Sequence, residues 1–122
     1  MKALIVDDSA VMRRVLVGAL SRAGISDVVE ACDGEEAVEA AGANELGLIL
    51  MDWNMPNMTG IEAVRAIRAN GLKTPIIMVT TEAEKERVVE ALKAGANNYA
   101  IKPFTPDTLV GKIKDTLEKA GV

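Results

Sequence analysis

The segment LGLILMDWNMPNMTG (46–60) contains an almost wholly apolar run that ends at a single carboxylate, Asp52. Parallel strands that are buried on both faces of a sheet have near-continuous apolar sequences, so residues 46–51 are predicted to form such a strand. The residues around Pro56 indicate a turn directly after it. The segment therefore predicts a buried strand that carries an acidic side chain at its carboxyl end.

On both sides of this segment, short apolar runs alternate with stretches in which apolar residues recur every three or four positions. This alternation predicts repeated strand–helix units. The other predicted strands are residues 3–6, 27–31, 75–79 and 98–101. The residues predicted to face the core from the helices are Met12, Val15, Leu16, Ala19 and Leu20; Ala37, Val38 and Ala41; Ile61, Val64 and Ile67; Val88, Val89 and Leu92; and Leu109, Ile113 and Leu117.

Five strand–helix units predict an α/β protein with a doubly wound, five-stranded parallel sheet and helices on both faces. The run 27–31 is the most polar of the predicted strands, so we expect it at an edge. The predicted strand order is 2-1-3-4-5, the flavodoxin-like arrangement. No linker, internal repeat or low-complexity tract interrupts the pattern, so residues 1–122 are predicted to form a single domain.

The chain has a net charge of −4 and a pI of about 4.9. An acidic balance argues against nucleic acid or an anionic membrane as the main partner, because both attract basic surfaces. The apolar runs are too short to span a bilayer, and Asp7 and Asp8 interrupt the N-terminal run, so neither membrane insertion nor a signal peptide is expected. Cys32 is the only cysteine, which excludes an internal disulfide and favours the reducing cytoplasm.

The chain contains no histidine, the commonest general base and a frequent transition-metal ligand. Its chemistry must therefore use carboxylates, hydroxyls and lysine, with a hard metal ion as a candidate cofactor. In open α/β sheets, ligands bind outside the carboxyl ends of the strands, so polar residues that follow the strands are expected to converge there. These residues are Asp7 and Asp8, Asp52, Thr80 and Thr81, and Lys102 with Pro103 after it.

Several polar positions also have a purely structural interpretation. Asp8 or Ser9 is a candidate N-cap of the first helix, and Asp33 and Thr59 are candidate N-caps of later helices. A single Asp at a strand end is usually a turn or cap residue. Three carboxylates, a hydroxyl and a lysine from four strand ends are much harder to explain in this way, and together they predict a binding site.

Three carboxylates at one edge of a sheet repel one another. At a separation of about 4 Å and an effective dielectric constant of about 20, each like-charged pair costs roughly 4 kcal/mol. Two or three carboxylates, a backbone carbonyl and waters suit Mg²⁺, which relieves this repulsion. Lys102 supplies a mobile positive charge for a carboxylate or a phosphate. With no histidine and one cysteine in the chain, zinc is not expected.

The polar residues at the strand ends resemble, in identity and order, those of the receiver domain of two-component response regulators. The resemblance covers essentially the whole chain, with no output domain attached. The matching residues are Asp7, Asp8, Asp52, Thr80, Lys102 and Pro103. Three segments are similar to the stand-alone chemotaxis regulators of the CheY type in particular: DDSAVMRR (7–14), DWNMPNMTG (52–60) and KPF (102–104). Chemotaxis regulators are themselves a standard example of the strand order predicted above.

This resemblance implies a role for each residue of the site. Asp52 would be the phosphoacceptor, whose carboxylate attacks phosphorus and becomes an acyl phosphate. Asp7 and Asp8 would hold Mg²⁺ with this carboxylate and the backbone carbonyl of Asn54. The metal would neutralise charge on the transferring phosphoryl group. Lys102 would pair with the phosphoryl oxygens.

The resemblance also implies a conformational switch. Thr80 would move to hydrogen-bond the new phosphoryl group, and Tyr99 would swing inward to fill the space that Thr80 leaves. The output surface would then be the fourth helix, fifth strand and fifth helix. The peptide bond between Lys102 and Pro103 is expected to be cis, which an X–Pro bond tolerates.

Loss of the phosphoryl group would be self-catalysed by an in-line water. Asn54 and Glu82 match the positions that handle this water in related proteins. Thr81 departs from the family pattern, which often has alanine or glycine after the switch threonine. Its larger side chain would restrict access to the acyl phosphate, which leaves the decay rate open.

Without a histidine of its own, the protein must receive its phosphoryl group from a partner histidine kinase or a small acyl phosphate. The resemblance implies a monomer that binds a downstream protein, namely the flagellar motor switch, and a phosphatase is a further candidate partner. The protein would not be an enzyme in the usual sense, because it catalyses only its own phosphorylation and dephosphorylation.

Three alternative functions remain open. The first is a stand-alone receiver in another phosphorelay or regulatory pathway. The second is a Mg²⁺-dependent aspartyl phosphatase, which would usually have a second acid where this chain has Asn54. The third is a flavin-binding electron carrier, which would need a hydroxyl- and glycine-rich phosphate loop after the first strand, where this chain has Asp7 and Asp8.

Overall fold

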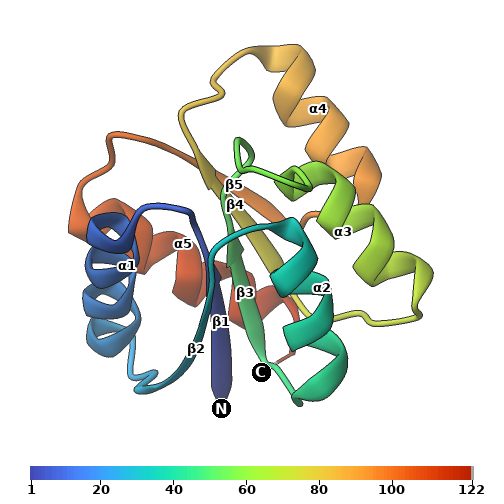
Figure 1. Ribbon diagram of the computed structural model, residues 1–122. Helices are drawn as coiled ribbons and strands as arrows, with labels where there is room; N and C mark the ends of the chain where they lie inside the picture. Colours follow the sequence, from blue (N-terminus) through green and yellow to red (C-terminus); the bar gives the residue numbers. More distant parts are fainter. Residues whose placement is uncertain (122) are drawn as a thin grey trace.

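The computed structural model describes residues 1–121 and has ten elements in strict β–α alternation (Figure 1). The strands are β1 (Lys2–Val6), β2 (Asp27–Ala31), β3 (Leu48–Met51), β4 (Ile76–Thr80) and β5 (Asn98–Ile101). The helices are α1 (Ala10–Arg22), α2 (Gly34–Ala43), α3 (Gly60–Ala69), α4 (Lys85–Ala94) and α5 (Pro106–Lys119). Every predicted strand is present, with ends within two residues of the prediction. Among the described helices, none is long and apolar enough to cross a membrane.

The strands form one parallel sheet in the order β2-β1-β3-β4-β5, which confirms the predicted doubly wound, flavodoxin-like fold. The polar strand β2 lies at an edge, as its sequence indicated. The register pairs Val6 with Met51, so the next residues, Asp7 and Asp52, leave the sheet side by side. It also pairs Thr80 with Ile101, the residue directly before Lys102.

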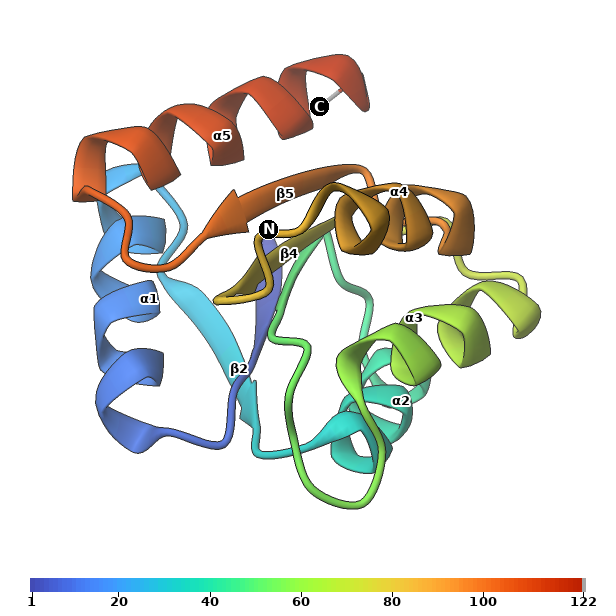
Figure 2. The same cartoon turned by 90° about the horizontal axis from the view of Figure 1, so that it is seen from above.

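Helices cover both faces of the sheet, with α1 and α5 on one face and α2, α3 and α4 on the other (Figure 2). Neighbouring residues of a strand point to opposite faces, so each buried strand contributes to both apolar clusters. In β1, for example, Leu4 packs beneath α2 and α3 while Ile5 packs beneath α1 and α5. This two-sided burial is why the central strands are apolar at nearly every position.

Side-chain caps determine where most of the helices begin. Ser9 caps α1 by accepting from the backbone N–H of Met12 at 3.2 Å, so it is Ser9 rather than Asp8 that has this role. Asp33 caps α2, and Thr59 caps α3 in a reciprocal capping box. By contrast, α4 begins after Glu84 without a side-chain cap.

The predicted inward faces of two helices were partly wrong. Val15 of α1 is 44% exposed, and Val89 and Leu92 of α4 are 39% and 48% exposed. Successive residues of a helix are rotated by about 100°, and the buried stripe of α1 runs through Leu16, Ala19 and Leu20, so Val15 lies beside that stripe rather than within it. In α4 only the small residue Ala91 is fully buried. This helix therefore contacts the sheet along a narrower stripe than its apolar sequence indicated.

Candidate functional site

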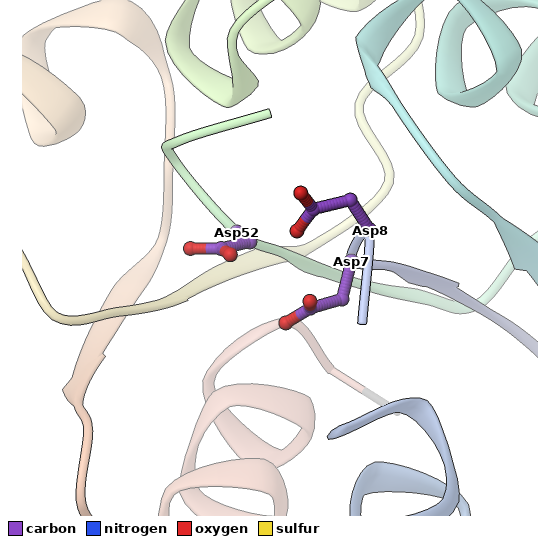
Figure 3. Close-up of side chains that lie close together, drawn as sticks. All are labelled: Asp7, Asp8 and Asp52. Atoms are coloured by element: carbon purple, nitrogen blue, oxygen red, sulfur yellow. The ribbon is translucent and has the colours of Figure 1, made fainter. Parts of the chain in front are cut away.

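Three carboxylates lie together at the carboxyl edge of the sheet. Asp7 and Asp8 follow β1 and Asp52 follows β3, and each offers an oxygen within 4.8 Å of the others (Figure 3). Asp7 and Asp52 are buried, at 1% and 8% exposure, whereas Asp8 is open to solvent. We call Asp7, Asp8 and Asp52 the acidic cluster. The structure thus brings together the residues that the sequence placed at two separate strand ends.

Lys102 reaches the acidic cluster from the end of β5. Its Nζ lies 2.7 Å from Oδ2 of Asp7 and 3.3 Å from Oδ2 of Asp52. The lysine side chain is itself mostly buried. The peptide bond between Lys102 and Pro103 is cis. One cation therefore bridges two carboxylates that would otherwise repel each other.

The environment shifts the pKa of both partners in this bridge. Burial raises the pKa of the Asp52 carboxyl, because a charged group loses hydration, and the charge of Lys102 only partly opposes this effect. Burial alone would lower the pKa of Lys102, but the hydrogen bond to Asp7 and the nearby carboxylate charges outweigh it and raise that pKa. The lysine therefore remains charged.

Local hydrogen bonds orient the two buried acids. Oδ1 of Asp7 accepts from the backbone N–H of Ser9 at 2.9 Å, and Oδ1 of Asp52 accepts from that of Trp53 at 2.7 Å. Arg13 of α1 donates to the backbone carbonyl of Asp7 at 2.7 Å. This last contact could not be predicted from the sequence, because Arg13 lies six residues away and reaches back across the first turn of its helix.

The acidic cluster fits Mg²⁺. Its donors are carboxylate oxygens from three residues, which this ion prefers, and the exposed Asp8 leaves a side of the cluster open to the waters that Mg²⁺ retains. Asn54, whose backbone carbonyl is the remaining predicted ligand, is exposed in the loop after β3. A bound Mg²⁺ would supply positive charge that offsets the mutual repulsion of these carboxylates.

The predicted switch residues lie next to this cluster on β4 and β5. Thr80 is fully buried, and its hydroxyl accepts from the backbone N–H of Glu82 at 3.3 Å. Tyr99 is also buried, and its hydroxyl donates to the backbone carbonyl of Glu82 at 2.5 Å. Burial, followed by the charge of Glu82, raises the pKa of Tyr99 to about 12. Thr81 is exposed, so it borders the site rather than filling it.

Trp53, directly after the predicted phosphoacceptor, contacts α4. The guanidinium of Arg87 lies 5.4 Å from the centre of the Trp53 ring, and the same side chain forms ion pairs with Glu82 and Glu90. Arg87 therefore connects the loop after β4, the first turns of α4 and the residue beside Asp52. This arginine could not be singled out from the sequence, because nothing in the local pattern distinguishes it from other solvated residues of the helix.

The chain as a whole has counterparts among known proteins. Residues 3–114 match the family model described as the response regulator receiver domain. The chain belongs to this family. As a receiver, it is similar to chemotaxis protein CheY1 of Helicobacter pylori strain J99, at 49% identity over 96% of this chain and 97% of that protein. It is also 50% identical to the CheY homolog of Campylobacter jejuni strain 81-176, over 96% and 92% of the two chains.

Solved structures show the same receiver architecture. The Vibrio cholerae chemotaxis protein CheY4 is 40% identical, with a TM-score of 0.86 over 94% of this chain and 97% of that chain. The receiver domain of Francisella response regulator 1452 is 29% identical, with a TM-score of 0.89 over 98% of each chain. The resemblance to CheY-type receivers, first suggested by residues at the strand ends, is therefore confirmed.

Proposed function

We propose that this receiver is a phosphorylation-switched signalling protein that accepts a phosphoryl group on Asp52 from a partner histidine kinase in the cytoplasm. The observation that carries this proposal is the placement of a buried Asp52 carboxylate between a lysine ammonium and two further acids. The absence of histidine from the chain means that the donor histidine belongs to another protein. Similarity to chemotaxis proteins supports a role in chemotaxis, with the flagellar motor switch as the downstream target.

In the proposed transfer, an oxygen of Asp52 attacks phosphorus, and an O–P bond forms as the bond to the donor nitrogen breaks. The bonding electron pair goes to the donor imidazole, and the product on this chain is an acyl phosphate. Lys102, already 3.3 Å from Asp52, would pair with the phosphoryl oxygens. Asp7 and Asp8 would hold Mg²⁺ with Asp52. The charge of the metal ion would offset the negative charge brought by the phosphoryl group.

The phosphoryl group would shift the protein between two conformations. Such a shift requires the group to interact better with one conformation than with the other. The new oxygens would accept hydrogen bonds from Thr80 and Lys102. Without the phosphoryl group, the Thr80 hydroxyl accepts from the N–H of Glu82, and Lys102 pairs with Asp7. Movement of Thr80 would change the surroundings of Tyr99, which bonds to the same Glu82 segment. The signal would leave through α4, β5 and α5.

We further propose that the receiver removes its own phosphoryl group and acts on no other substrate. Asn54 and Glu82 would position the attacking water. Glu82 lies 3.6 Å from Arg87, so this ion pair would compete with a role at the water. The exposed Thr81 borders the same approach. A partner phosphatase would supply faster removal if these features make the intrinsic reaction slow.

The direct test is the mass of the protein after incubation with Mg²⁺ and a small acyl phosphate. We expect the wild type to gain one phosphoryl group and Asp52→Asn to gain none. Asp115→Asn is the matched control, because Asp115 is a half-exposed carboxylate on α5 that is paired with Lys119 outside the cluster. Phosphorylation of the Asp52→Asn protein would contradict the assignment of the acceptor.

A second experiment identifies the pathway. Phosphorylated and unphosphorylated protein would be used as baits, and the captured proteins compared. Selective capture of a motor-switch protein by the phosphorylated form is expected for a chemotaxis role. Selective capture of a different target would instead assign the receiver to another phosphorelay or regulatory pathway.

A further inference from the structure

The loop between β3 and α3 is tied to the start of α2 by a side-chain hydrogen bond. The amide of Asn57 donates to Oδ2 of Asp33 at 2.7 Å, while Oδ1 of the same carboxylate accepts from the backbone N–H of Glu36 at 2.8 Å. Hydrogen bonds to an ionised carboxylate are stronger than those between neutral groups. Both oxygens of the buried Asp33 are therefore used, one to cap a helix and the other to hold the loop.

Backbone features beside this pair make the contact between loop and helix close. The N–H of Gly34 donates to the carbonyl of Met58 at 3.1 Å. A Cβ on Gly34 would lie 2.5 Å from that carbonyl oxygen, so this approach requires glycine. Asn57 has a φ of 67°, in the left-handed region that asparagine tolerates better than most residues. The loop is thus held by one side-chain hydrogen bond and one close backbone contact, and Asn57 has the positive φ that this arrangement needs.

This anchored loop carries Asn54, the predicted backbone ligand of the metal. Figure 2 shows the loop running out from the end of β3, past the first turn of α2, and back to α3. On its other side, the N–H of Gly60 donates to the carbonyl of Trp53 at 2.9 Å. Asn54 therefore lies on a short segment between two fixed points, and displacement of Asn57 would displace its carbonyl.

We propose that Asp33 and Asn57 are positioning residues for the metal site: they hold the loop so that the Asn54 carbonyl faces the acidic cluster. This inference rests on the proposed function, because it assumes that the cluster binds Mg²⁺. Neither side chain belongs to the acidic cluster itself. A ligand that is held in place before binding loses less conformational freedom on binding. Release of the loop is therefore expected to weaken Mg²⁺ binding more than it slows phosphoryl transfer at saturating Mg²⁺.

Three variants test this proposal. Asn57→Asp sets two carboxylates against each other and breaks the tie. The double variant Asp33→Asn/Asn57→Asp restores a hydrogen bond with donor and acceptor exchanged, and it keeps the α2 cap because asparagine caps helices as well as aspartate does. Asn57→Gly removes the whole side chain, and with it the amide, but retains access to positive φ. Mg²⁺ affinity is read from Trp53 fluorescence, folding from urea unfolding, and reactivity from the rate of phosphorylation by a small acyl phosphate.

We expect Asn57→Asp and Asn57→Gly to raise the Mg²⁺ dissociation constant by about tenfold, a change of about 1.4 kcal/mol. The double variant should return to within about twofold of the wild type, and all rates at saturating Mg²⁺ should stay within about threefold. Two outcomes would overturn the proposal. One is an unchanged or tighter Mg²⁺ affinity in Asn57→Asp, as its added negative charge alone would produce. The other is a folded double variant whose affinity is not restored.

The proposed function has its own control in the same experiment. Wild-type protein that neither responds to Mg²⁺ nor gains a phosphoryl group would contradict the function itself. The other outcome is a wild-type protein that responds to Mg²⁺ and gains a phosphoryl group, with variants that bind Mg²⁺ as tightly as the wild type. This outcome would contradict only the positioning role. The two failures are therefore distinguishable.

Discussion

The guanidinium of Arg87 lies over the ring of Trp53, 5.4 Å from its centre. The arginine belongs to α4, whereas the tryptophan directly follows the predicted phosphoacceptor. The contact therefore joins the proposed phosphorylation site to the helix that begins the proposed output surface. Trp53 is the only tryptophan, so the tryptophan fluorescence of the protein comes from this residue alone.

Arg87→Ala is expected to shift the Trp53 emission to longer wavelength, because loss of the covering side chain admits water to a ring that is now only 4% exposed. The contact contributes about 0.5–1 kcal/mol, so the variant should remain folded. Arg65→Ala is the matched control, since Arg65 also pairs with Glu90 but belongs to α3. An emission spectrum unchanged in Arg87→Ala would show that the ring does not depend on this arginine.

Lys102→Met is expected to destabilise the metal-free protein by about 3 kcal/mol, because it removes the cation that bridges two buried carboxylates. At the same Mg²⁺ concentration, the ion should then stabilise the variant more than the wild type, because it becomes the main positive charge in the cluster. A free Mg²⁺ concentration of 100 times the dissociation constant adds about 2.7 kcal/mol to the free energy of unfolding. Urea unfolding with Mg²⁺ or with a chelator measures both effects.

The matched control for this prediction is Lys119→Met, which removes an exposed lysine paired with Asp115 at 3.3 Å on α5. Exposed pairs contribute at most about 1 kcal/mol, so little change is expected with or without Mg²⁺. Equal stability of Lys102→Met and the wild type in chelator would mean that the bridge contributes nothing to folding.

Tyr99 is expected to ionise only near pH 12, because burial and the charge of Glu82 disfavour the tyrosinate. A pKa raised above the unfolded value of about 10 contributes stability that is present below pH 10 and is lost as the pH rises towards 12. The chain has one tyrosine, so tyrosinate absorbance reports this group directly. The urea-unfolded protein should titrate near 10, and native protein titrating at the same pH would contradict the buried hydroxyl.

Gly60→Ala is expected to destabilise the protein by about 1–3 kcal/mol, because the added Cβ would overlap the backbone carbonyl of Asp52. Gly18→Ala is the control: it lies on an exposed part of α1 with no atom near the new methyl group, and it should stabilise the protein by about 0.5–1 kcal/mol. Urea unfolding compares the two directly. Similar effects of both substitutions would exclude the close approach of the start of α3 to the backbone of Asp52.

The sheet and the main site residues could be predicted from the sequence because their signals are local. Asp52 follows a strand that is apolar on both faces, and Lys102 follows another strand two units later in the pattern. In a parallel sheet all carboxyl ends meet at one edge, so the order of strand–helix units was enough to place these residues together. The expected caps at Asp33 and Thr59 rest on equally local chemistry.

Other features could not be predicted, because they depend on how separate elements approach each other. Val89 and Leu92 have the spacing of a buried helical face, yet both are exposed because only Ala91 of α4 lies fully against the core. Periodicity gives the direction of an apolar face but not the depth to which neighbouring helices cover it. The position of α4 depends on its contacts with α3, an element that is separate from it in the sequence.

The sequence by itself determined the strand–helix alternation, the strand order and the set of groups at the carboxyl edge, since hydrophobic periodicity and strand-end residues are local properties of the chain. Only the tertiary structure decided which groups touch: the Lys102 bridge between Asp7 and Asp52, and the bond from Asn57 to Asp33. Each of these contacts joins residues at least 24 positions apart. Distances of a few ångströms between such residues follow from the packing of whole elements, which no local pattern encodes.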